Sequence, residues 1–138
     1  MTQAMFKLDT DSIQKMAFFE SITKTSLRDC IEGDNDLIFI VNSENLGKAI
    51  GKKGSNIKLL ERRFNKKIIL IGFDNDPSKF MENLLKPIQL KTINLDEDDN
   101  LNVVIKSSSR AFPSKKVKKA KTLLKKYFPS IKEVNVKV

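Results

Sequence analysis

The stretch "AIGKKGSNIKLLERRF", residues 49–64, decides the fold because it joins a glycine-containing turn to an amphipathic helix. Gly51 and Gly54 enclose two lysines in a chain that has only five glycines. Glycine lacks a Cβ and tolerates positive φ, so this spacing predicts a tight turn that ends one helix and begins another. The second helix is expected to run to about Phe64, with its apolar positions inward and its basic positions outward.

The same turn has the properties of an anion-binding site. The new helix is expected to direct amide groups and the positive end of its dipole toward the turn. Lys52 and Lys53 add two positive charges there. The pattern therefore predicts that a phosphodiester backbone is held by shape and charge, without its bases being read by the loop.

Two other phosphate-binding loops do not fit the spacing. The triphosphate loop requires G-x-x-x-x-G-K-[ST], whereas three residues separate Gly47 from Gly51 and Lys53 replaces the required hydroxyl. The dinucleotide fingerprint lacks its first glycine pair and should follow a strand directly. The pattern that remains is G-x-x-G between two helices.

The charge of the whole chain also favours an anionic partner. Twenty-six basic residues against 17 acidic ones give a net charge of +9, which is most often a sign of nucleic-acid binding. The basic residues gather in 48–67 and 106–126, and the acidic ones in 32–36 and 96–100. We interpret the acidic segments as exposed hairpin turns, because the calcium-loop pattern is missing.

Composition argues against several other classes. The chain has no histidine and one cysteine, which excludes an intramolecular disulfide and leaves the usual metal sites and histidine-based catalysis without their residues. Cys30 is expected to pack as a small apolar residue. No apolar run approaches the roughly 18 residues of a membrane span, and the polar start does not resemble a secretory signal. We expect a cytoplasmic, monomeric protein that is not an enzyme and needs no cofactor or metal.

An internal duplication organises the chain. Phe18 and Phe80 lie in similar segments 62 positions apart, and Leu37 and Leu101 open similar strands 64 positions apart. The repeat predicts two domains, 1–74 and 75–138.

The first domain is expected to follow the order helix, strand, strand, helix, helix, strand. Four phenylalanines of this domain fall on inward positions and are expected in the core: Phe18, Phe19, Phe39 and Phe64. The leading helix, capped within 9–12, is expected to bury Ile13, Met16, Ala17, Phe19 and Ile22. Strands are expected at 26–31, 37–41 and 66–73, the last one central or covered because it is apolar on both faces. Ser43 is the expected cap of the short helix before the glycine turn.

The second domain repeats most of this order. Its leading helix is expected to be capped by Asp76, with Pro77 in the first helical position. Strands near 88–95, 101–106 and 131–138 surround a helix that begins near Pro113 and buries Val117, Ala120 and Leu124.

These features resemble the KH family, in which an apolar residue, G-x-x-G and a helix follow one another. Ile50, the loop and Ile57 match that signature. The leading helix and strand resemble the type II topology. The whole chain is similar to archaeal NusA-like transcription factors. The resemblance implies an α+β fold of two tandem type II KH domains, each a helical layer on a three-stranded mixed sheet.

The resemblance also implies a set of RNA-binding residues. The clamp would be Gly51, Lys52, Lys53 and Gly54. The flanks of the groove would be Ile50, Ser55, Asn56, Ile57 and Lys58, and we add the basic neighbours Lys48 and Arg62. The second domain departs from the family, because Pro113 and three polar residues replace its loop, and proline has no amide hydrogen. Its candidate contacts with RNA or a partner protein are Arg110, Lys115, Lys116, Lys118 and Lys119.

Three functions agree with these features. The resemblance implies a single-stranded RNA-binding protein that acts on nascent transcripts in transcription elongation or termination. RNA binding in another process, such as ribosome assembly, is an alternative. In a third hypothesis the second domain is an adaptor that binds RNA polymerase or another transcription protein.

Overall fold

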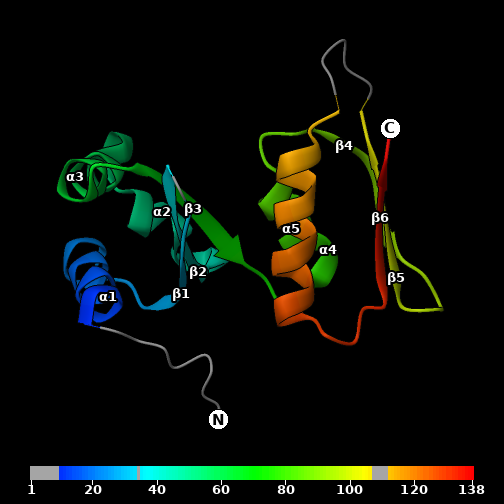
Figure 1. Cartoon of the computed structure of the whole chain (residues 1–138), viewed down its shortest axis with the longest axis horizontal. Helices are drawn as coiled ribbons and strands as arrows, with labels where there is room; N and C mark the ends of the chain where they lie inside the picture. Colours follow the sequence, from blue (N-terminus) through cyan, green and yellow to red (C-terminus); the bar gives the residue numbers. More distant parts are fainter. Residues whose placement is uncertain (1–9, 34, 107–111) are drawn as a thin grey trace. The chain divides into compact units, whose positions relative to one another are not determined.

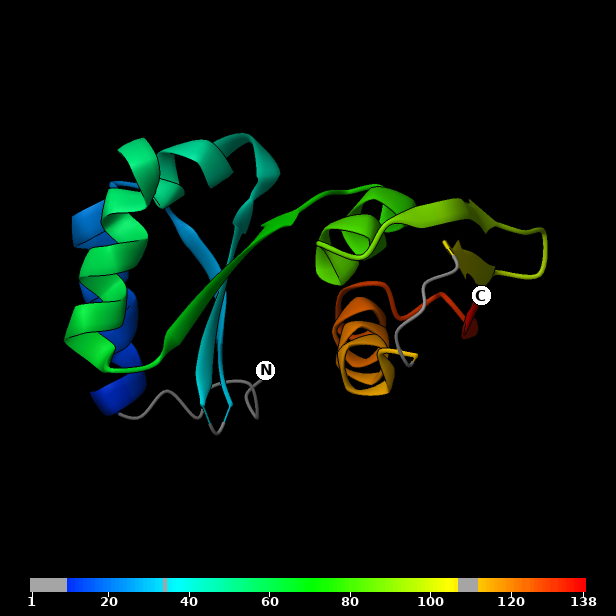
Figure 2. The same ribbon diagram turned by 90° about the horizontal axis from the view of Figure 1, so that it is seen from above.

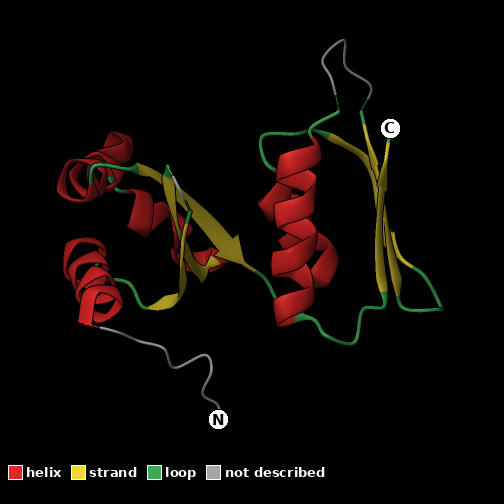
Figure 3. Cartoon of the chain, viewed as in Figure 1, coloured by secondary structure: helices red, strands yellow, loops and turns green. Residues whose placement is uncertain are grey.

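The computed structural model describes residues 10–33, 35–106 and 112–138. The chain divides into two compact units, Met1–Phe73 and Asp74–Val138. Each unit has helices and one three-stranded mixed sheet, as Figure 3 shows by colour, which confirms the predicted α+β class of tandem KH domains. Within the described ranges, no helix is long and apolar enough to cross a membrane.

The first unit follows the predicted order of elements. Its helices and strands are α1 (Thr10–Thr23), β1 (Leu27–Glu32), β2 (Asp36–Asn42), α2 (Leu46–Ile50), α3 (Ser55–Phe64) and β3 (Lys67–Phe73). The strand order is β1-β2-β3, in which β1 runs antiparallel and β3 parallel to the central strand β2. Parallel strands need a long crossover connection, and α2 and α3 supply it.

The helices of this unit cover one face of the sheet (Figures 1 and 2). Phe19 of α1 stacks on Phe39 of β2 with 4.4 Å between ring centroids, and both are fully buried. Phe18 and Phe64 are half-buried and meet edge to face at 5.6 Å. The predicted aromatic core is therefore present. The other buried members of this core are Leu37, Val41, Ala49, Leu60 and Ile68.

Two predictions about the first unit were wrong in detail, and the structure decides between two alternatives for β3. Ile13 is 52% exposed and Ala17 is also exposed, because the buried face of α1 is the one that carries Phe19. The apolar strand β3, predicted to be central or covered, is a covered edge strand: it lies at the edge of the sheet, and all its residues but Lys67 are buried or half-buried. Ser43 does not cap a helix. It begins a 3₁₀ turn, Ser43–Asn45, that precedes α2 and has no side-chain cap.

The second unit repeats this pairing with fewer helices among its described residues. Its elements are α4 (Pro77–Leu85), β4 (Leu90–Leu95), β5 (Asn100–Ile105), α5 (Ser114–Tyr127) and β6 (Glu133–Lys137). Strand β5 is central, antiparallel to β4 and parallel to β6. The register shift between Leu27 and Asp29 in β1 recurs between Leu90 and Thr92 in β4, 63 positions later. The shared irregularity agrees with the duplication seen in the sequence.

The predicted start of α4 and the predicted buried residues of α5 are confirmed. Asp76 Oδ1 accepts a hydrogen bond from the amide of Ser78 at 2.9 Å, with Pro77 first in the helix. Val117, Ala120 and Leu124 of α5 are buried.

The acidic turn between β4 and β5 is organised by Asp96. Its carboxylate accepts hydrogen bonds from the side-chain amide of Asn102 and from the backbone amides of Asn100 and Asp98, at 2.9–3.0 Å. The bond from Asn102, followed by that from Asn100, holds the pKa of Asp96 below its usual value. The carboxylate therefore has a structural role in the turn.

Cys30 packs beside the core of the first unit, opposite Phe39 on the neighbouring strand. Burial raises the pKa of its thiol to about 11. The side chain is thus a neutral, half-buried thiol at physiological pH.

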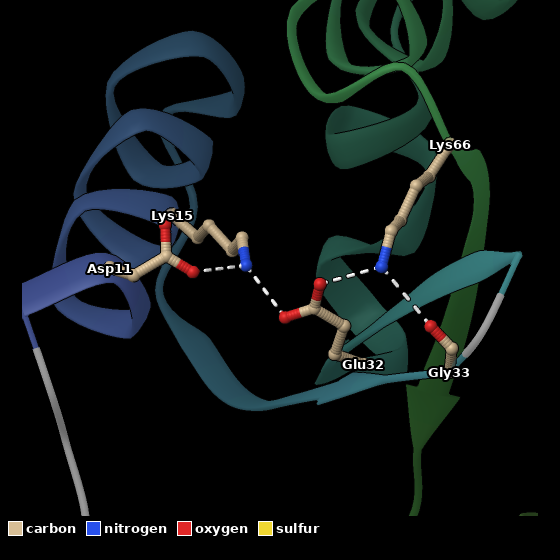
Figure 4. Close-up of polar contacts among 5 residues, drawn as sticks. All are labelled: Asp11, Lys15, Glu32, Gly33 and Lys66. Atoms are coloured by element: carbon tan, nitrogen blue, oxygen red, sulfur yellow. Dashed lines mark hydrogen bonds and ion pairs between the residues drawn. The ribbon is translucent and has the colours of Figure 1, made fainter.

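A bridge of charges ties three segments of the first unit together (Figure 4). Glu32, at the end of β1, lies 2.6 Å from Lys15 of α1 and 2.6 Å from Lys66, which precedes β3. Lys15 also pairs with Asp11, and Lys66 donates to the carbonyl of Gly33 at 3.1 Å. The hydrogen bonds that Glu32 accepts from Lys15 and then Lys66 lower the pKa of Glu32 to about 2, and those that Lys15 donates to Asp11 and Glu32 raise the pKa of Lys15.

This bridge predicts a pH-dependent contribution to stability. A carboxyl group whose pKa is depressed on folding stabilises the fold above its unfolded pKa of about 4.3 and loses that effect as the pH falls toward 2. Because Glu32 is about half exposed, Glu32→Gln should lower the free energy of unfolding at pH 7 by at most about 1 kcal/mol. Urea denaturation from pH 7 to pH 3 should show this difference shrinking below about pH 4.5. The exposed, unbridged Glu44 gives the control Glu44→Gln, and a deficit for Glu32→Gln that is constant with pH contradicts the prediction.

Candidate nucleic-acid interface

The candidate site is the turn Gly51–Gly54 between α2 and α3. Helix α2 ends at Ile50, and Gly51 leaves it with φ 81° and ψ 166°. Lys53 (φ 55°) and Gly54 (φ 73°) both adopt the left-handed conformation before α3 begins at Ser55. The chain thus makes the predicted helix-to-helix turn in four residues.

The two glycines are required for different reasons. A Cβ on Gly51 would lie 2.8 Å from Ser55 Oγ and 2.9 Å from the backbone nitrogen of Asn56, so any side chain there would force the turn open. A Cβ on Gly54 would meet nothing within 4 Å, and only its positive φ favours glycine. Gly51 therefore fixes the close approach of the two helices, and Gly54 fixes the direction of the chain.

Lys52 and Lys53 are exposed at the tip of this turn. Lys53 occupies a left-handed conformation that costs a residue with a Cβ about 1 kcal/mol or more. Strained residues gather at functional sites, where the surrounding structure holds them in place. The turn thus keeps a lysine at a position where glycine would be less strained.

Several amides of the turn are used inside it. The amide of Gly51 donates to the carbonyl of Gly47 and that of Gly54 to the carbonyl of Gly51, both at 3.1 Å. The amide of Ser55 donates to the carbonyl of Lys52. These three donors are already satisfied, so the lysine side chains carry more of the attraction for an anion than the sequence alone suggests.

Asn56 fastens the two helices to each other across the turn. Its side-chain amide donates to the carbonyl of Lys48 at 3.2 Å, one of the carbonyls that the short helix α2 leaves without a helical partner. The sequence places Asn56 at the flank of the groove but does not predict this contact, since residues eight positions apart across a turn give no periodic signal.

The remaining candidates lie on α2 and α3 and form a half-buried apolar group and an exposed polar group. Ile50 and Ile57 are half-buried, and Ile57 packs against the core. The polar and basic candidates on α2 and α3 are exposed: Lys48, Ser55, Lys58 and Arg62. The structure thus places most of the predicted residues next to the turn, on the two helices that it joins, whereas Arg62 lies in the last turn of α3, away from it.

Two basic residues elsewhere in the first unit lie against aromatic rings, which the sequence did not predict. The guanidinium of Arg63 lies 5.4 Å from the ring centroid of Phe18 and 5.8 Å from that of Phe64. The guanidinium of Arg28 lies 3.9 Å from the ring centroid of Phe73. Such cation–π contacts occupy these charges within the protein.

The second unit places no glycine turn before its long helix. Pro113 directly precedes α5, and Lys115, Lys118 and Lys119 are exposed while Lys116 is half-buried. Arg110 lies outside the described residues. Any anion held here would meet lysine side chains and not a turn like Gly51–Gly54.

No metal-binding group is found in the part of the chain that the structure describes. No three side chains among its Cys, Asp and Glu residues are arranged to hold an ion. The acidic residues act in turns and ion pairs instead, as Asp96 and Glu32 do.

Comparison with known proteins identifies the class of fold and site. A sequence model described as "KH domain" matches residues 14–100, so the chain belongs to the KH domain family. The match covers α1, the glycine turn and α3, and extends into the second unit.

Individual relatives show which members of this family the chain is similar to. The chain is 40% identical over 90 residues to "Probable transcription termination protein NusA" of Methanocaldococcus jannaschii, and 36% identical over 87 residues to the protein of that name in Methanococcus vannielii. These alignments cover 65% and 63% of this chain but only 49% and 50% of the relatives. The chain therefore matches about half the length of these two relatives. A crystal structure of APE1850 superposes with a TM-score of 0.68 and 31% identity over 93% of this chain and 99% of that one.

The geometry of the glycines predicts three different stabilities. Gly51→Ala should lower the free energy of unfolding by about 2 kcal/mol or more, because strain from positive φ adds to overlap with Ser55 and Asn56. Gly54→Ala should cost only about 1 kcal/mol. Gly47→Ala, in helix α2 with open space around it, should stabilise by about 0.5 kcal/mol.

Urea denaturation of the three alanine variants measures this order. Gly47→Ala is the matched control, since it adds the same methyl group four residues away. A Gly51→Ala variant as stable as the Gly54→Ala variant would show that the helices do not meet closely at Gly51.

Proposed function

We propose that the chain is a single-stranded RNA-binding protein whose principal contact is the turn Gly51–Gly54. The observation that carries the proposal is the pair of exposed lysines, one in a strained conformation, at a turn that only glycine can close. Membership of the KH domain family supports the same function, because KH domains clamp a nucleic-acid backbone with a G-x-x-G loop.

In this mechanism the loop holds the backbone and its flanks hold the bases. The ammonium groups of Lys52 and Lys53 neutralise one or two phosphates, a contact that positions the strand without reading its sequence. The half-buried Ile50 and Ile57 offer an apolar floor for bases beside the turn. Exposed basic residues around them, Lys48, Lys58 and Arg62, raise the local concentration of RNA.

We further propose that this RNA is a nascent transcript and that the protein acts in transcription elongation or termination in the cytoplasm, without enzymatic activity. The relatives named as probable NusA proteins support this role. RNA polymerase is the corresponding protein partner. A pulldown from cells followed by sequencing of crosslinked RNA tests the role separately from binding.

The binding site is tested by reversing charge at the turn. Lys52→Asp together with Lys53→Asp should weaken binding of an unstructured RNA of about eight nucleotides by about tenfold or more, because two phosphate contacts become repulsive. Fluorescence anisotropy measures the affinity. The slope of log affinity against log salt should also become shallower, by roughly 0.7 for each phosphate that the variant no longer neutralises.

The control variant carries the same change of charge elsewhere. Lys79 and Lys86 are exposed in and after α4, so Lys79→Asp with Lys86→Asp keeps the net charge equal to that of the test variant. Thermal melting should show both variants folded, since all four lysines are exposed. If both variants bind RNA equally, the turn is not the clamp.

A further inference from the structure

Helix α5 carries a high positive charge that its packing against the rest of the unit does not explain. Its sequence SKKVKKAKTLLKKY contains seven lysines and no acidic residue. One side of the helix is buried through Val117, Ala120, Leu123 and Leu124. The opposite side is an exposed arc, which we call the lysine face, formed by Lys115, Lys118, Lys119, Lys125 and Lys126 with Thr122 among them. At its C-terminal end, Lys125 donates to the carbonyl of Lys132 at 3.2 Å and the ammonium of Lys126 lies 5.6 Å from the ring centroid of Tyr127.

This arrangement is electrostatically unfavourable in the free protein. Lysines three and four positions apart on a helix repel each other, as Lys115 does with Lys118 and Lys119. A stable solvated helix usually places acidic residues at this spacing, and α5 has none. Among the described residues, Lys115 and Lys118 have no carboxylate within ion-pair distance. A bound polyanion would remove this repulsion.

The chemistry of the lysine face favours a phosphate backbone over a protein surface. Protein interfaces are depleted of lysine and depend on aromatic, apolar and arginine anchors. The exposed arc offers no such anchor, and the hydroxyl of Thr122, its one uncharged member, donates to the carbonyl of Lys118 at 3.1 Å. Lysine ammonium groups in a row are instead what a strand of phosphates requires.

The lysine face also lies in the unit that has no glycine turn before its long helix. Pro113 precedes α5 and has no amide hydrogen to offer a phosphate. Pro113 cannot contribute an amide to a phosphate site before α5, and the exposed side chains of α5 are nearly all lysines.

We propose that the lysine face of α5 is a second, sequence-independent site for the sugar-phosphate backbone of the RNA held at Gly51–Gly54. This inference rests on the proposed function of the first unit. Only residues 74–76 separate β3 from α4, so binding at one unit makes binding at the other intramolecular. The second site should therefore strengthen the binding of long RNA without changing that of short RNA.

The test compares two RNA lengths with a charge-neutralised helix. Lys115→Gln, Lys118→Gln and Lys119→Gln are combined, and a matched control combines Lys79→Gln, Lys86→Gln and Lys91→Gln, which are also exposed in the second unit. Fluorescence anisotropy is measured with unstructured RNAs of about six and about 20 nucleotides. Circular dichroism melting establishes that each variant is folded.

The expected result depends on length. The lysine-face variant should bind the short RNA like the unmodified protein and the long RNA about tenfold more weakly. Its salt slope for the long RNA should fall by roughly 2, at about 0.7 for each of three phosphates that are no longer neutralised. The matched control should keep the affinity of the unmodified protein for both RNAs.

Three results would overturn the inference. They are unchanged binding of long RNA by the lysine-face variant, an equal loss in the matched control, and competition by poly-glutamate as effective as that by polyuridine. The last result would assign the face to acidic proteins. Failure of the first-unit proposal is distinguishable, because the Lys52→Asp, Lys53→Asp variant would then still bind the short RNA, whatever the lysine face does.

Discussion

The parallel pairing of β2 with β3 is the constraint on which the first unit depends. A hairpin cannot join parallel strands, so the chain must return across the sheet, and it does so through α2 and α3. Ala49 and Leu60, one from each helix, are fully buried in the same core as β2. Both helices are therefore packed against the sheet, and the turn between them consists of the four residues Gly51–Gly54. The topology thus requires a turn between the two helices, and the residues of the site set its shape through Gly51 and Gly54 and its charge through Lys52 and Lys53.

Much of this arrangement could be predicted from the sequence, because its signals are local. The spacing of Gly51 and Gly54 predicts the turn, Asp76 and Pro77 predict the start of α4, and the repeat predicts that the strand pairing recurs. The edge position of β3 could not be predicted, since a continuous apolar run is equally compatible with a central strand and with a covered edge. The exposure of Ile13 depends on which face of α1 meets the sheet, and the helix has apolar residues on more than one face.

Contacts between distant segments were also beyond sequence reasoning. Glu32 meets Lys15 and Lys66, which are 17 and 34 positions away. The guanidinium of Arg28 lies over the ring of Phe73 across the sheet. Neither contact has a periodic signature, yet each decides whether a charge is available to a ligand. The candidate residues could therefore be named from the sequence, but the charges that remain free could be identified only from the structure.

Ion pairs within the first unit distinguish its basic residues from one another. In the sequence, Lys66 belongs to the same basic segment as Lys52 and Lys53. In the structure, Glu32 pairs with both Lys66 and Lys15, Asp11 supplies a second carboxylate to Lys15, and the depressed pKa of Glu32 keeps that bridge ionised across the physiological range. Lys15 and Lys66 are thus paired with carboxylates, whereas Lys52 and Lys53 are exposed on a turn that contains no acidic residue. In the proposed function, an approaching polyanion would meet an uncompensated positive field at the turn, which the placement of the carboxylates favours as much as the placement of the lysines does.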